Sequence, residues 1–479
     1  MRYTIERAMP PRRVDPRAVA AGTALADILA HYDVASRARV TIDHDGKRLS
    51  AFDGEPLAIS LMAHGRTTLA RSIKFHRPRG PCCLRGACDG CLTRVDGVPN
   101  VMACRVPARE GAAVISQNAF PTAKLDVLRV TDWFFPKHFD HHHLLVKWGR
   151  AVNATMQVFA RRMAGLGTMP ETDGPVVPPE IVDADVLVVG AGVAGLAVAT
   201  LLARSKLSVV CVEEHTHVGG MLLDGLQPLE DRQGARVPAT LFAHALGQGA
   251  HDAGVRLFTQ ATACATFDNG TLVMAADRAL LVRTHARVFA NGCCEQVGSF
   301  ENNDMPGIYT ARAAAVALSH GVAIGDRVVI AGAVWPVPGV SDALLQLGAT
   351  VIPVEVDSVV SAGGGARVTS VTVRDGDKTR KLRCDTLVVA NEPTPAYELL
   401  GQAGVAAHAE SRRGCFVPVC DDSDGSTERD DVFAIGSVAG TFESLGPVDL
   451  RDPLSAAGPV ARARRVANAL LTRRARAAT

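Results

Sequence analysis

The sequence has little of several features that would place it in a simple class of protein. Aromatic residues make up 5% of its 479 residues, and 51 basic against 49 acidic side chains leave a net charge of +2. A balance this even argues against a general attraction to nucleic acid. No apolar run has the length of a transmembrane helix, and Asp15, Arg17 and Asp27 interrupt the amino-terminal stretch where a signal peptide would need an apolar core. We therefore expect a cytoplasmic protein without a membrane span.

Arginines cluster near both ends of the chain, at Arg12–Arg13 and at Arg473–Arg474–Arg476. With so little net charge around them, we expect these clusters to be solvated tails rather than binding patches.

Cysteine is plentiful, with twelve in the chain, but a cytoplasmic location argues against a disulfide framework. Five cysteines lie between residues 82 and 104, and four of these stand in the order C-x4-C-x2-C followed by one more: Cys83, Cys88, Cys91 and Cys104. This is the plant-type ferredoxin spacing for a [2Fe–2S] cluster. The small residues Gly86, Ala87 and Gly90 would let a loop wrap the cluster and present backbone amides to its sulfurs.

Two alternatives stay open at these cysteines. Four thiols can also hold one zinc ion, although zinc sites usually use paired C-x2-C knuckles and here the fourth cysteine stands alone. Cys82 could replace Cys83 at C-x5-C spacing, but the plainer interpretation is a neighbour that does not bind the cluster.

A second motif predicts a dinucleotide site. The apolar run Val186–Val189 is typical of a buried parallel strand, and glycines follow it in the G-x-G-x-x-G spacing at Gly190, Gly192 and Gly195. A helix is expected over 194–204, so that the backbone around Val193 and Ala194 would present amides to a pyrophosphate.

The next strand, expected over 208–212, ends at Glu213, which lies 23 residues after Gly190 and is placed to bind ribose hydroxyls. Glu214 is the alternative if this assignment is wrong by one residue. The competing interpretation of the whole motif is a glycine-rich turn without a ligand.

Residues 327–331 predict the first strand of a second Rossmann-like lobe, but the turn after it reads GAVWPVPG. The phosphate-loop glycines are missing, two prolines remove amide donors, and Trp335 would fill the space of a nucleotide. We expect a structural lobe that has lost nicotinamide binding, with a rearranged site as the alternative.

These elements predict an α/β protein with a two-dinucleotide-binding-domain, disulfide-reductase-like Rossmann flavoprotein fold and an amino-terminal β-grasp ferredoxin-like domain. The β-grasp domain is indicated by a hairpin that turns at Asp45–Gly46, a helix over 55–64 and a second hairpin before Cys104. The expected divisions are an arm over 1–37, the [2Fe–2S] domain over 38–118, a helical linker over 119–182, the FAD or dinucleotide domain over 183–305 and 412–479, and the degenerate NAD(P)-like lobe over 306–411. In the linker, His138, His141, His142 and His143 suggest a metal, but interface packing is the preferred interpretation because no further ligand completes a site.

From Arg39 to Leu471 the chain resembles the α-subunit type of heteromeric amine- and amino-acid-oxidising flavoenzymes. This group includes α-subunits of sarcosine oxidase, opine oxidases and proline or hydroxyproline dehydrogenases, and subunits of hydrogen cyanide synthase. The motifs that carry the resemblance are SIKFHRPRG, the ferredoxin cysteines with VDGVPNVMAC, GAGVAGL, EEHTHVGGML, ANGCCE, NNDMPGIYTA and VFAIGSVAG.

The resemblance implies cluster ligation by the four cysteines above and adds dinucleotide contacts at Gly220, Met221, Gly292 and Gly436. Ser437 stands where relatives of the wider fold carry an aspartate that bonds the ribityl chain, and a hydroxyl replaces that bond only in part. Because the sequence ends at Thr479, we also expect no folate-binding domain of the sarcosine oxidase type.

The function expected from the resemblance is that of an oxidoreductase subunit with FAD, or NAD at the same site, and a [2Fe–2S] cluster. It would relay electrons from a small amine or amino acid of the sarcosine, opine, hydroxyproline or glycine type, oxidised on an amine-oxidase-type flavoprotein β-subunit. The resemblance allows for FMN at the partner interface. The sequence offers no catalytic residue. The alternatives are a self-contained NAD(P)H-linked flavin reductase or dehydrogenase, and a scaffold subunit that binds a nucleotide without turnover.

Overall fold

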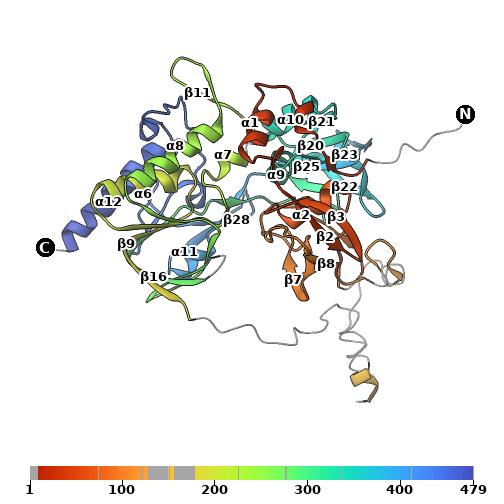
Figure 1. Cartoon of the computed structure of the whole chain (residues 1–479), viewed down its shortest axis with the longest axis horizontal. Helices are drawn as coiled ribbons and strands as arrows, with labels where there is room; N and C mark the ends of the chain where they lie inside the picture. The colour runs from red at the N-terminus through yellow and green to blue at the C-terminus, as the bar shows by residue number, and fades with distance from the viewer. Residues whose placement is uncertain are drawn as a thin grey trace, which may run out of the picture. The chain divides into compact units, whose positions relative to one another are not determined.

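The computed structural model describes residues 9–73, 75–119, 122–127, 149, 151–155, 178–224, 226–275, 278–334, 336–411 and 413–477. The chain divides into two compact units, each built from two separate segments (Figure 1). The first unit joins residues 1–174 to 296–391, and the second joins 175–295 to 392–479. Most of the expected linker, with its four histidines, lies outside the described residues.

The ferredoxin-like part of the first unit is a five-stranded sheet in the order β3-β2-β8-β6-β7. Its strands are β2 (Arg39–His44), β3 (Lys47–Phe52), β6 (Leu92–Val95), β7 (Val98–Met102) and β8 (Ala113–Ser116). The expected hairpin turn forms because Asp45 and Gly46 both adopt positive φ, of 51° and 75°. Helix α2 (Leu57–Ala63) buries Leu57, Leu61 and Met62 completely. The sheet and this helix confirm the expected β-grasp domain.

The same unit contains the second Rossmann-like lobe, a parallel four-stranded sheet in the order β18-β25-β20-β21. These strands are β18 (Ile308–Thr310), β20 (Arg327–Ala331), β21 (Thr350–Val354) and β25 (Thr386–Val389), with helices α9 (Ala311–Ser319) and α10 (Val337–Gln346). Beside it lies an antiparallel sheet of β22 (Val359–Gly364), β23 (Val368–Asp375) and β24 (Lys378–Arg383). Ile308, Val329, Leu387 and Val371 share one buried core, so the two sheets are packed together.

The amino-terminal arm is part of this unit rather than a solvated tail. Strand β1 (Arg12–Arg13) pairs with β19 (Val322–Ala323), and helix α1 (Ala24–His31) follows. Arg12 forms an ion pair with Asp326 at 2.7 Å, and Arg13 pairs with the buried Glu55. The expectation of a solvated arginine cluster is therefore wrong here, because a partner with opposite charge lies in another element that sequence spacing does not bring near.

The second unit is organised on a seven-stranded sheet whose main path is β13-β10-β9-β16-β15-β14, with β29 paired to β16. The strands are β9 (Glu180–Val189), β10 (Val209–Val212), β13 (Arg256–Phe258), β14 (Ala261–Phe267), β15 (Gly270–Ala275), β16 (Ala279–Phe289) and β29 (Val432–Ala434). β9, β10, β13, β16 and β29 form the parallel part. Strand β9 begins at Glu180, before the expected end of the linker at residue 182, and its first residues pair with β16.

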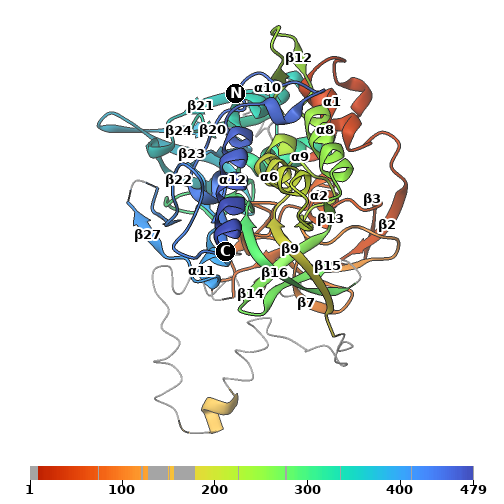
Figure 2. The same cartoon turned by 90° about the vertical axis from the view of Figure 1, so that its left-hand side faces the viewer.

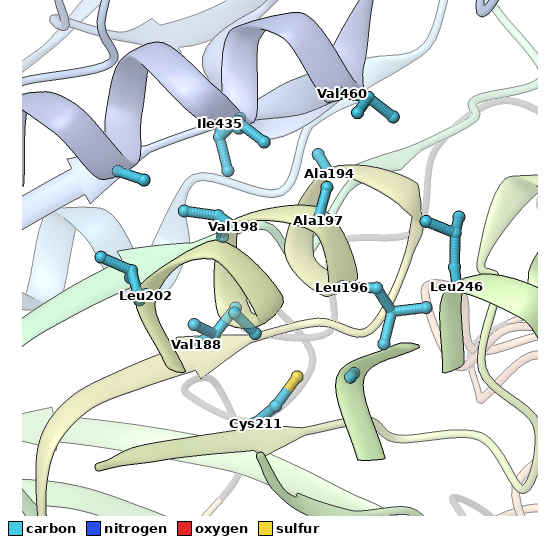
Figure 3. Close-up of a cluster of buried hydrophobic side chains, with 14 of the residues drawn as sticks. Val188, Ala194, Leu196, Ala197, Val198, Leu202, Cys211, Leu246, Ile435 and Val460 are labelled. Carbon is cyan, nitrogen blue, oxygen red and sulfur yellow. The ribbon is translucent and has the colours of Figure 1, made fainter. Parts of the chain in front are cut away.

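Three helices pack beside this sheet, namely α6 (Val193–Arg204), α8 (Ala239–Asp252) and α12 (Pro459–Ala477) (Figure 2). These helices and the sheet share one hydrophobic core, which contains Val188 of β9, Leu202 of α6, Leu246 of α8 and Val460 of α12 (Figure 3). Val186–Val189 are at most 4% exposed, as expected for a strand covered on both faces. This packing holds the start of α6 in a fixed place at the end of β9.

Smaller elements complete the second unit: α7 (Met221–Asp224), β11 (Leu229–Glu230), β12 (Arg236–Val237), β17 (Cys293–Cys294), β26 (Thr394–Pro395), α11 (Glu398–Gln402), β27 (Ala407–Glu410), β28 (Cys415–Pro418) and the 3-10 turn η4 (Gly436–Ala439). At its carboxyl-terminal end, Arg474 pairs with Asp185 at 2.7 Å and Arg473 lies 3.8 Å from Asp430. Arg474 and Arg476 are exposed, so this cluster is solvated as expected, although it belongs to helix α12 rather than to a separate tail. Within the described residues, no helix is both long and apolar enough to span a bilayer.

Candidate functional sites

Cys83, Cys88 and Cys91 lie in the loop between β5 (Pro78–Arg79) and β6, and Cys104 follows β7. Cys83, Cys91 and Cys104 are at most 6% exposed, and Cys88 is partly buried. The four thiols form two hydrogen-bonded pairs, Cys83 with Cys88 and Cys91 with Cys104. The hydrogen bond to Cys88, together with burial, raises the pKa of Cys83, and the bond to Cys91 does the same for the pKa of Cys104. Each pair therefore shares protons that metal binding would displace.

Backbone amides point at these sulfurs. The N–H groups of Arg85 and Ala87 donate to Cys83 Sγ at 3.4 and 3.3 Å. The Gly86 amide donates to the Cys104 sulfur, which lowers the pKa of that thiol against the larger effects of pairing and burial. Amide donors of this kind stabilise negative charge on sulfur.

The loop is tight enough that glycine is required within it. A Cβ on Gly90 would lie 2.2 Å from the Gly80 carbonyl oxygen, and one on Gly80 would lie 1.9 Å from the Thr67 oxygen. Side chains at these two positions would therefore force the loop open.

The donor set fits a two-iron cluster. In the described part of the chain, no group of three or more His, Cys, Asp or Glu side chains is arranged to hold one metal ion. The thiols stand as two adjacent hydrogen-bonded pairs, Cys83 with Cys88 and Cys91 with Cys104. Four thiolates on two irons, with amides directed at the sulfurs, is the ligand set of a [2Fe–2S] cluster.

The glycine motif of the second unit forms the turn from β9 into α6. Gly190 has φ +100°, and a Cβ there would lie 2.4 Å from the Ala290 oxygen. A Cβ on Gly195 would lie 1.9 Å from the Gly190 oxygen, so strand and helix are in direct backbone contact. At Gly192 the nearest atom would be 3.9 Å away, on Gly220. The middle glycine therefore faces open space, where a phosphate can approach the backbone.

Helix α6 begins directly at this open space. Gly192 is its N-cap and contributes no side chain, and the first intrahelical bond runs from Leu196 N to Gly192 O at 2.9 Å. The amides of Val193, Ala194 and Gly195 precede that bond and so have no acceptor within the helix. Together with the helix dipole they form a site for an anion.

The Glu213 side chain reaches this turn. The Glu213 carboxylate is 6% exposed and accepts hydrogen bonds from Ala191 N at 2.8 Å and His215 N at 3.0 Å. Glu214 instead lies 3.3 Å from His215 Nε2 and is half-exposed. Each Glu213 oxygen keeps a further lone pair for a ribose hydroxyl.

The residues suggested by resemblance surround the same cradle. Gly219 pairs with Gly192 through an isolated bridge, and a Cβ on the adjacent Gly220 would lie 3.0 Å from Gly192 Cα. A Cβ on Gly436 would lie 3.4 Å from Ala194 Cβ, which places η4 at the start of α6.

Cys293 also lies at the cradle, although the sequence did not indicate it. Ser437 Oγ lies 3.8 Å from Met221 Sδ, and the Cys293 thiol lies 4.0 Å from the same sulfur. A Cβ on Gly292 would lie 3.8 Å from Ser437 Oγ. Met221, Gly292 and Ser437 are therefore neighbours, and Cys293 joins them although spacing alone gives it no role.

The second lobe repeats part of this turn. A Cβ on Gly332, with φ +98°, would lie 2.5 Å from the Ala390 oxygen, much as Gly190 faces Ala290. The lobe thus keeps the first glycine, contrary to the expectation that all had gone, and Val334 and Val337 take the second and third positions. Glu355 follows β21 at the same 23-residue spacing.

The start of α10 nevertheless offers fewer free amide donors for an anion than the start of α6. Val337 N already donates to Val334 O at 3.0 Å, and Pro338 has no N–H. Gly339 is left to supply an amide in the first turn of α10. Trp335 lies outside the described residues.

Comparisons with known proteins agree with both sites. Residues 37–119 match the family model described as a 2Fe-2S iron-sulfur cluster binding domain, and residues 188–262 match an NAD(P)-binding Rossmann-like domain. The chain is 26% identical to the sarcosine oxidase α-subunit of Rhizobium meliloti over 407 residues, which cover 75% of this chain and 40% of that protein. It is 28% identical to a Corynebacterium counterpart over 371 residues, covering 72% of this chain and 34% of that protein. It therefore spans two-fifths or less of the length of these relatives.

A shorter stretch of the chain has a further relative. Over 83 residues the chain is 35% identical to hydrogen cyanide synthase subunit HcnA of Pseudomonas aeruginosa, which covers 17% of this chain and 79% of that protein. Among solved structures, L-proline dehydrogenase from P. horikoshii aligns with a TM-score of 0.62 and 22% identity, over 84% of this chain and 69% of that one.

The chain thus has the two-dinucleotide-binding-domain fold, joined to an amino-terminal 2Fe–2S cluster binding domain. In sequence the chain is similar to sarcosine oxidase α-subunits, at 26% and 28% identity to the two relatives above.

Proposed function

We propose that this chain is the electron-relaying subunit of an amine- or amino-acid-oxidising flavoenzyme. The supporting observation is that one chain carries both a thiol loop fitted to a [2Fe–2S] cluster and an intact dinucleotide cradle. The substrate would be a small amine or amino acid of the sarcosine, opine, hydroxyproline or glycine type. Its oxidation would take place on an amine-oxidase-type flavoprotein β-subunit, with FMN at the interface as a further element of this proposal.

In this proposal the cluster ligands are Cys83, Cys88, Cys91 and Cys104. FAD occupies the cradle formed by Gly190, Gly192, Val193, Ala194, Gly195, Glu213, Gly220, Met221, Gly292, Gly436 and Ser437. Glu214, whose carboxylate lies 3.3 Å from His215 Nε2, remains the alternative for the ribose contact. The chemistry supplied by such groups is acceptance of an electron pair and its onward transfer as single electrons.

The chain's own residues would bind and orient these groups. The first-turn amides of α6 would hold the pyrophosphate, and Glu213 would fix the ribose. Amide donors from Arg85 and Ala87 would stabilise negative charge at the Cys83 sulfur and so favour reduction of the cluster.

The test is a visible absorption spectrum of anaerobically purified protein, followed by acid release and identification of the nucleotide. Flavin bands with broad iron–sulfur absorption, and released FAD, are the expected result. The Cys88→Ser variant should lose the iron–sulfur absorption and keep the flavin. A colourless protein that releases NAD or ATP, or that contains zinc in place of iron, would contradict the proposal and leave a scaffold subunit.

The rival function, a self-contained NAD(P)H-linked flavin reductase, needs a nicotinamide site in the second lobe. The prolines and the Val337–Val334 bond at the start of α10 leave that lobe without the usual set of phosphate donors. The relay function requires no such site, and for this reason we prefer it.

A further inference from the structure

The antiparallel sheet of the second lobe ends in a basic strand that lies at the edge of the sheet. The strand order is β22-β23-β24, so among the described residues β24 has a hydrogen-bonded neighbour strand on one side alone. Its sequence is KTRKLR, and every residue in it except Leu382 is exposed. β24 is therefore an exposed sheet edge, and such an edge can pair with a further strand.

The backbone of this edge has hydrogen-bonding groups that β23 does not use. The two-residue turn Gly376–Asp377 joins the strands, and pairs with and without backbone hydrogen bonds alternate from that turn onward. Thr379, Lys381 and Arg383 belong to the pairs without them, so their N–H and C=O groups point away from β23. The Arg383 carbonyl agrees, since it accepts a bond from Arg327 Nε at 2.7 Å. In the part of the chain that the structure describes, the backbone groups of Thr379 and Lys381 have no partner.

The side chains of the hairpin concentrate positive charge on one face. Successive side chains of a strand point to opposite faces, and Leu382 packs against the buried core of the lobe. Its neighbours Lys381 and Arg383 therefore face solvent. Arg374 of β23 stands opposite Thr379 and so lies on the same face. This solvent face carries three cations and no acidic residue of either strand.

The positive charge of the hairpin is not neutralised within the lobe. Of the ten residues 374–383, five are Lys or Arg and two are Asp, in a chain whose net charge is +2. Arg380 and Asp375 approach to 3.8 Å, with side chains 62% and 69% exposed, but they lie on the opposite face. Among the described residues, the three cations of the solvent face form no ion pair. Like charges repel a second copy of this edge, whereas an acidic strand would be attracted to it.

We propose that β24 is a docking edge for an acidic, extended segment of a partner protein, which adds to the sheet as a further strand. The outward backbone groups of Thr379 and Lys381 supply hydrogen bonds, and this part of the interaction does not depend on the partner's side chains. Lys381 and Arg383 select the partner, because they meet carboxylates at alternate positions of the incoming strand. The inference does not depend on the cofactors proposed above, and it gives the second lobe a role in assembly.

The test is fluorescence anisotropy with the full chain and a labelled peptide. The probe is a peptide as long as β24, with alternating Glu and Thr and with blocked ends. In one control peptide Lys replaces Glu, which reverses the charge. In the other Pro replaces Thr, which keeps the charge but removes the amides that a strand needs. We expect the Glu–Thr peptide to bind, with an affinity that falls as salt is added, and both controls to bind far more weakly.

Variants of the chain separate the charge from the strand pairing. Lys381→Glu should weaken binding about fivefold or more, because an attraction across the strands becomes a repulsion. Thr379→Pro removes an outward N–H, leaves the bonds to β23 and the charge in place, and should abolish binding. Lys47→Glu, at an exposed position of the edge strand β3, makes the same change in net charge and should bind as wild type does. Circular dichroism confirms that each variant is folded.

Hydrogen exchange measured by mass spectrometry gives a second readout that does not rely on a variant. The amides of Thr379 and Lys381 should exchange more slowly when the Glu–Thr peptide is bound. Equal binding of the Pro-containing peptide, or binding without this protection, would overturn strand addition and leave a general attraction of anions.

Two further outcomes would also overturn the inference. Binding of oligo(dT) or of phosphatidylserine vesicles, without binding of the peptide, would assign the edge to a nucleic acid or to a membrane surface. If wild type does not bind the Glu–Thr peptide even at low salt, the charges serve only to protect the edge from pairing.

Discussion

Both terminal nitrogens of Arg13 donate to the Glu55 carboxylate, at 2.6 and 2.8 Å, and so join strand β1 of the amino-terminal arm to the residue just before helix α2. The Glu55 side chain is 1% exposed and also accepts a hydrogen bond from Ser60 Oγ at 2.7 Å. Arg13 makes a further bond to the His320 carbonyl oxygen at 2.9 Å. One arginine therefore binds the arm, the ferredoxin-like domain and the end of α9.

Replacing Arg13 with methionine should lower the free energy of unfolding of the first unit by roughly 3 kcal/mol, because the Glu55 carboxylate would stay buried without its partner. The measurement is denaturation by guanidinium, followed by circular dichroism. Arg12→Met is the control: the Arg12–Asp326 pair is about 40% exposed on both sides, and its loss should cost less than about 1 kcal/mol. Equal losses in the two variants would contradict the special role of Arg13.

The dinucleotide cradle makes opposite predictions for two of its glycines. Gly192→Ala should fold normally, since the new methyl group meets no atom closer than 3.9 Å, but it should occupy the phosphate position and release the nucleotide. Gly195→Ala should destabilise the second unit itself, because its methyl group would lie 1.9 Å from the Gly190 oxygen. Thermal unfolding and nucleotide content, measured on both variants, distinguish these effects. A Gly192→Ala protein that keeps its full nucleotide content would show that the ligand does not pass over this turn.

The local elements could be predicted from the sequence because their signals are local. The strand, glycine turn and helix at Val186–Arg204 and the hairpin at Asp45–Gly46 are each determined by residues close in the chain. The structure confirms these elements, and Glu213 contacts the glycine turn through Ala191 N.

The contacts between distant segments could not be predicted in this way. Glu55 and Arg13 are 42 residues apart, and the bond from Thr310 to Cys82 joins two domains that the sequence treats as separate. The need for glycine at position 332 could not be predicted either. It arises because the Ala390 carbonyl lies close to Gly332, and no glycine spacing in the sequence indicates that contact. A spacing motif depends only on residues that are close in the sequence. It therefore does not predict which distant strands and loops will be in contact in the folded protein.

NADH and NADPH should not reduce the flavin of the isolated chain. The first turn of α10 contains Pro338, and its Val337 amide is already bonded to Val334, so a pyrophosphate would lack the donors that α6 offers. The measurement is anaerobic mixing with a tenfold excess of either nucleotide while the flavin absorbance is followed, with dithionite as the positive control. Bleaching that saturates with NADH concentration would contradict this prediction and restore the reductase function.

The stability of the first unit should fall as the pH drops below 6.5, because of His320. Burial lowers the pKa of this imidazole from 6.5 to about 4, and its ring packs against Tyr32 with centroids 4.7 Å apart. Above pH 6.5 the ring is neutral in both the folded and the unfolded chain, so it contributes no pH dependence. Between pH 6.5 and 4 the unfolded chain binds a proton that the folded chain excludes, and the free energy of unfolding falls, by about 1 kcal/mol at pH 5.5.

Replacing His320 with asparagine removes the titrating ring while keeping an N–H group near the Val316 carbonyl, which His320 Nδ1 contacts at 3.0 Å. The variant is expected to be less stable at pH 7.5 but to lose this part of the pH dependence. Guanidinium denaturation at pH 7.5, 6.5 and 5.5 measures the slope, and His408→Asn, at an exposed position in β27, serves as the control and should keep the wild-type slope. An unchanged slope in His320→Asn would mean that another group takes up the proton, since linkage requires the slope to follow the residue that titrates.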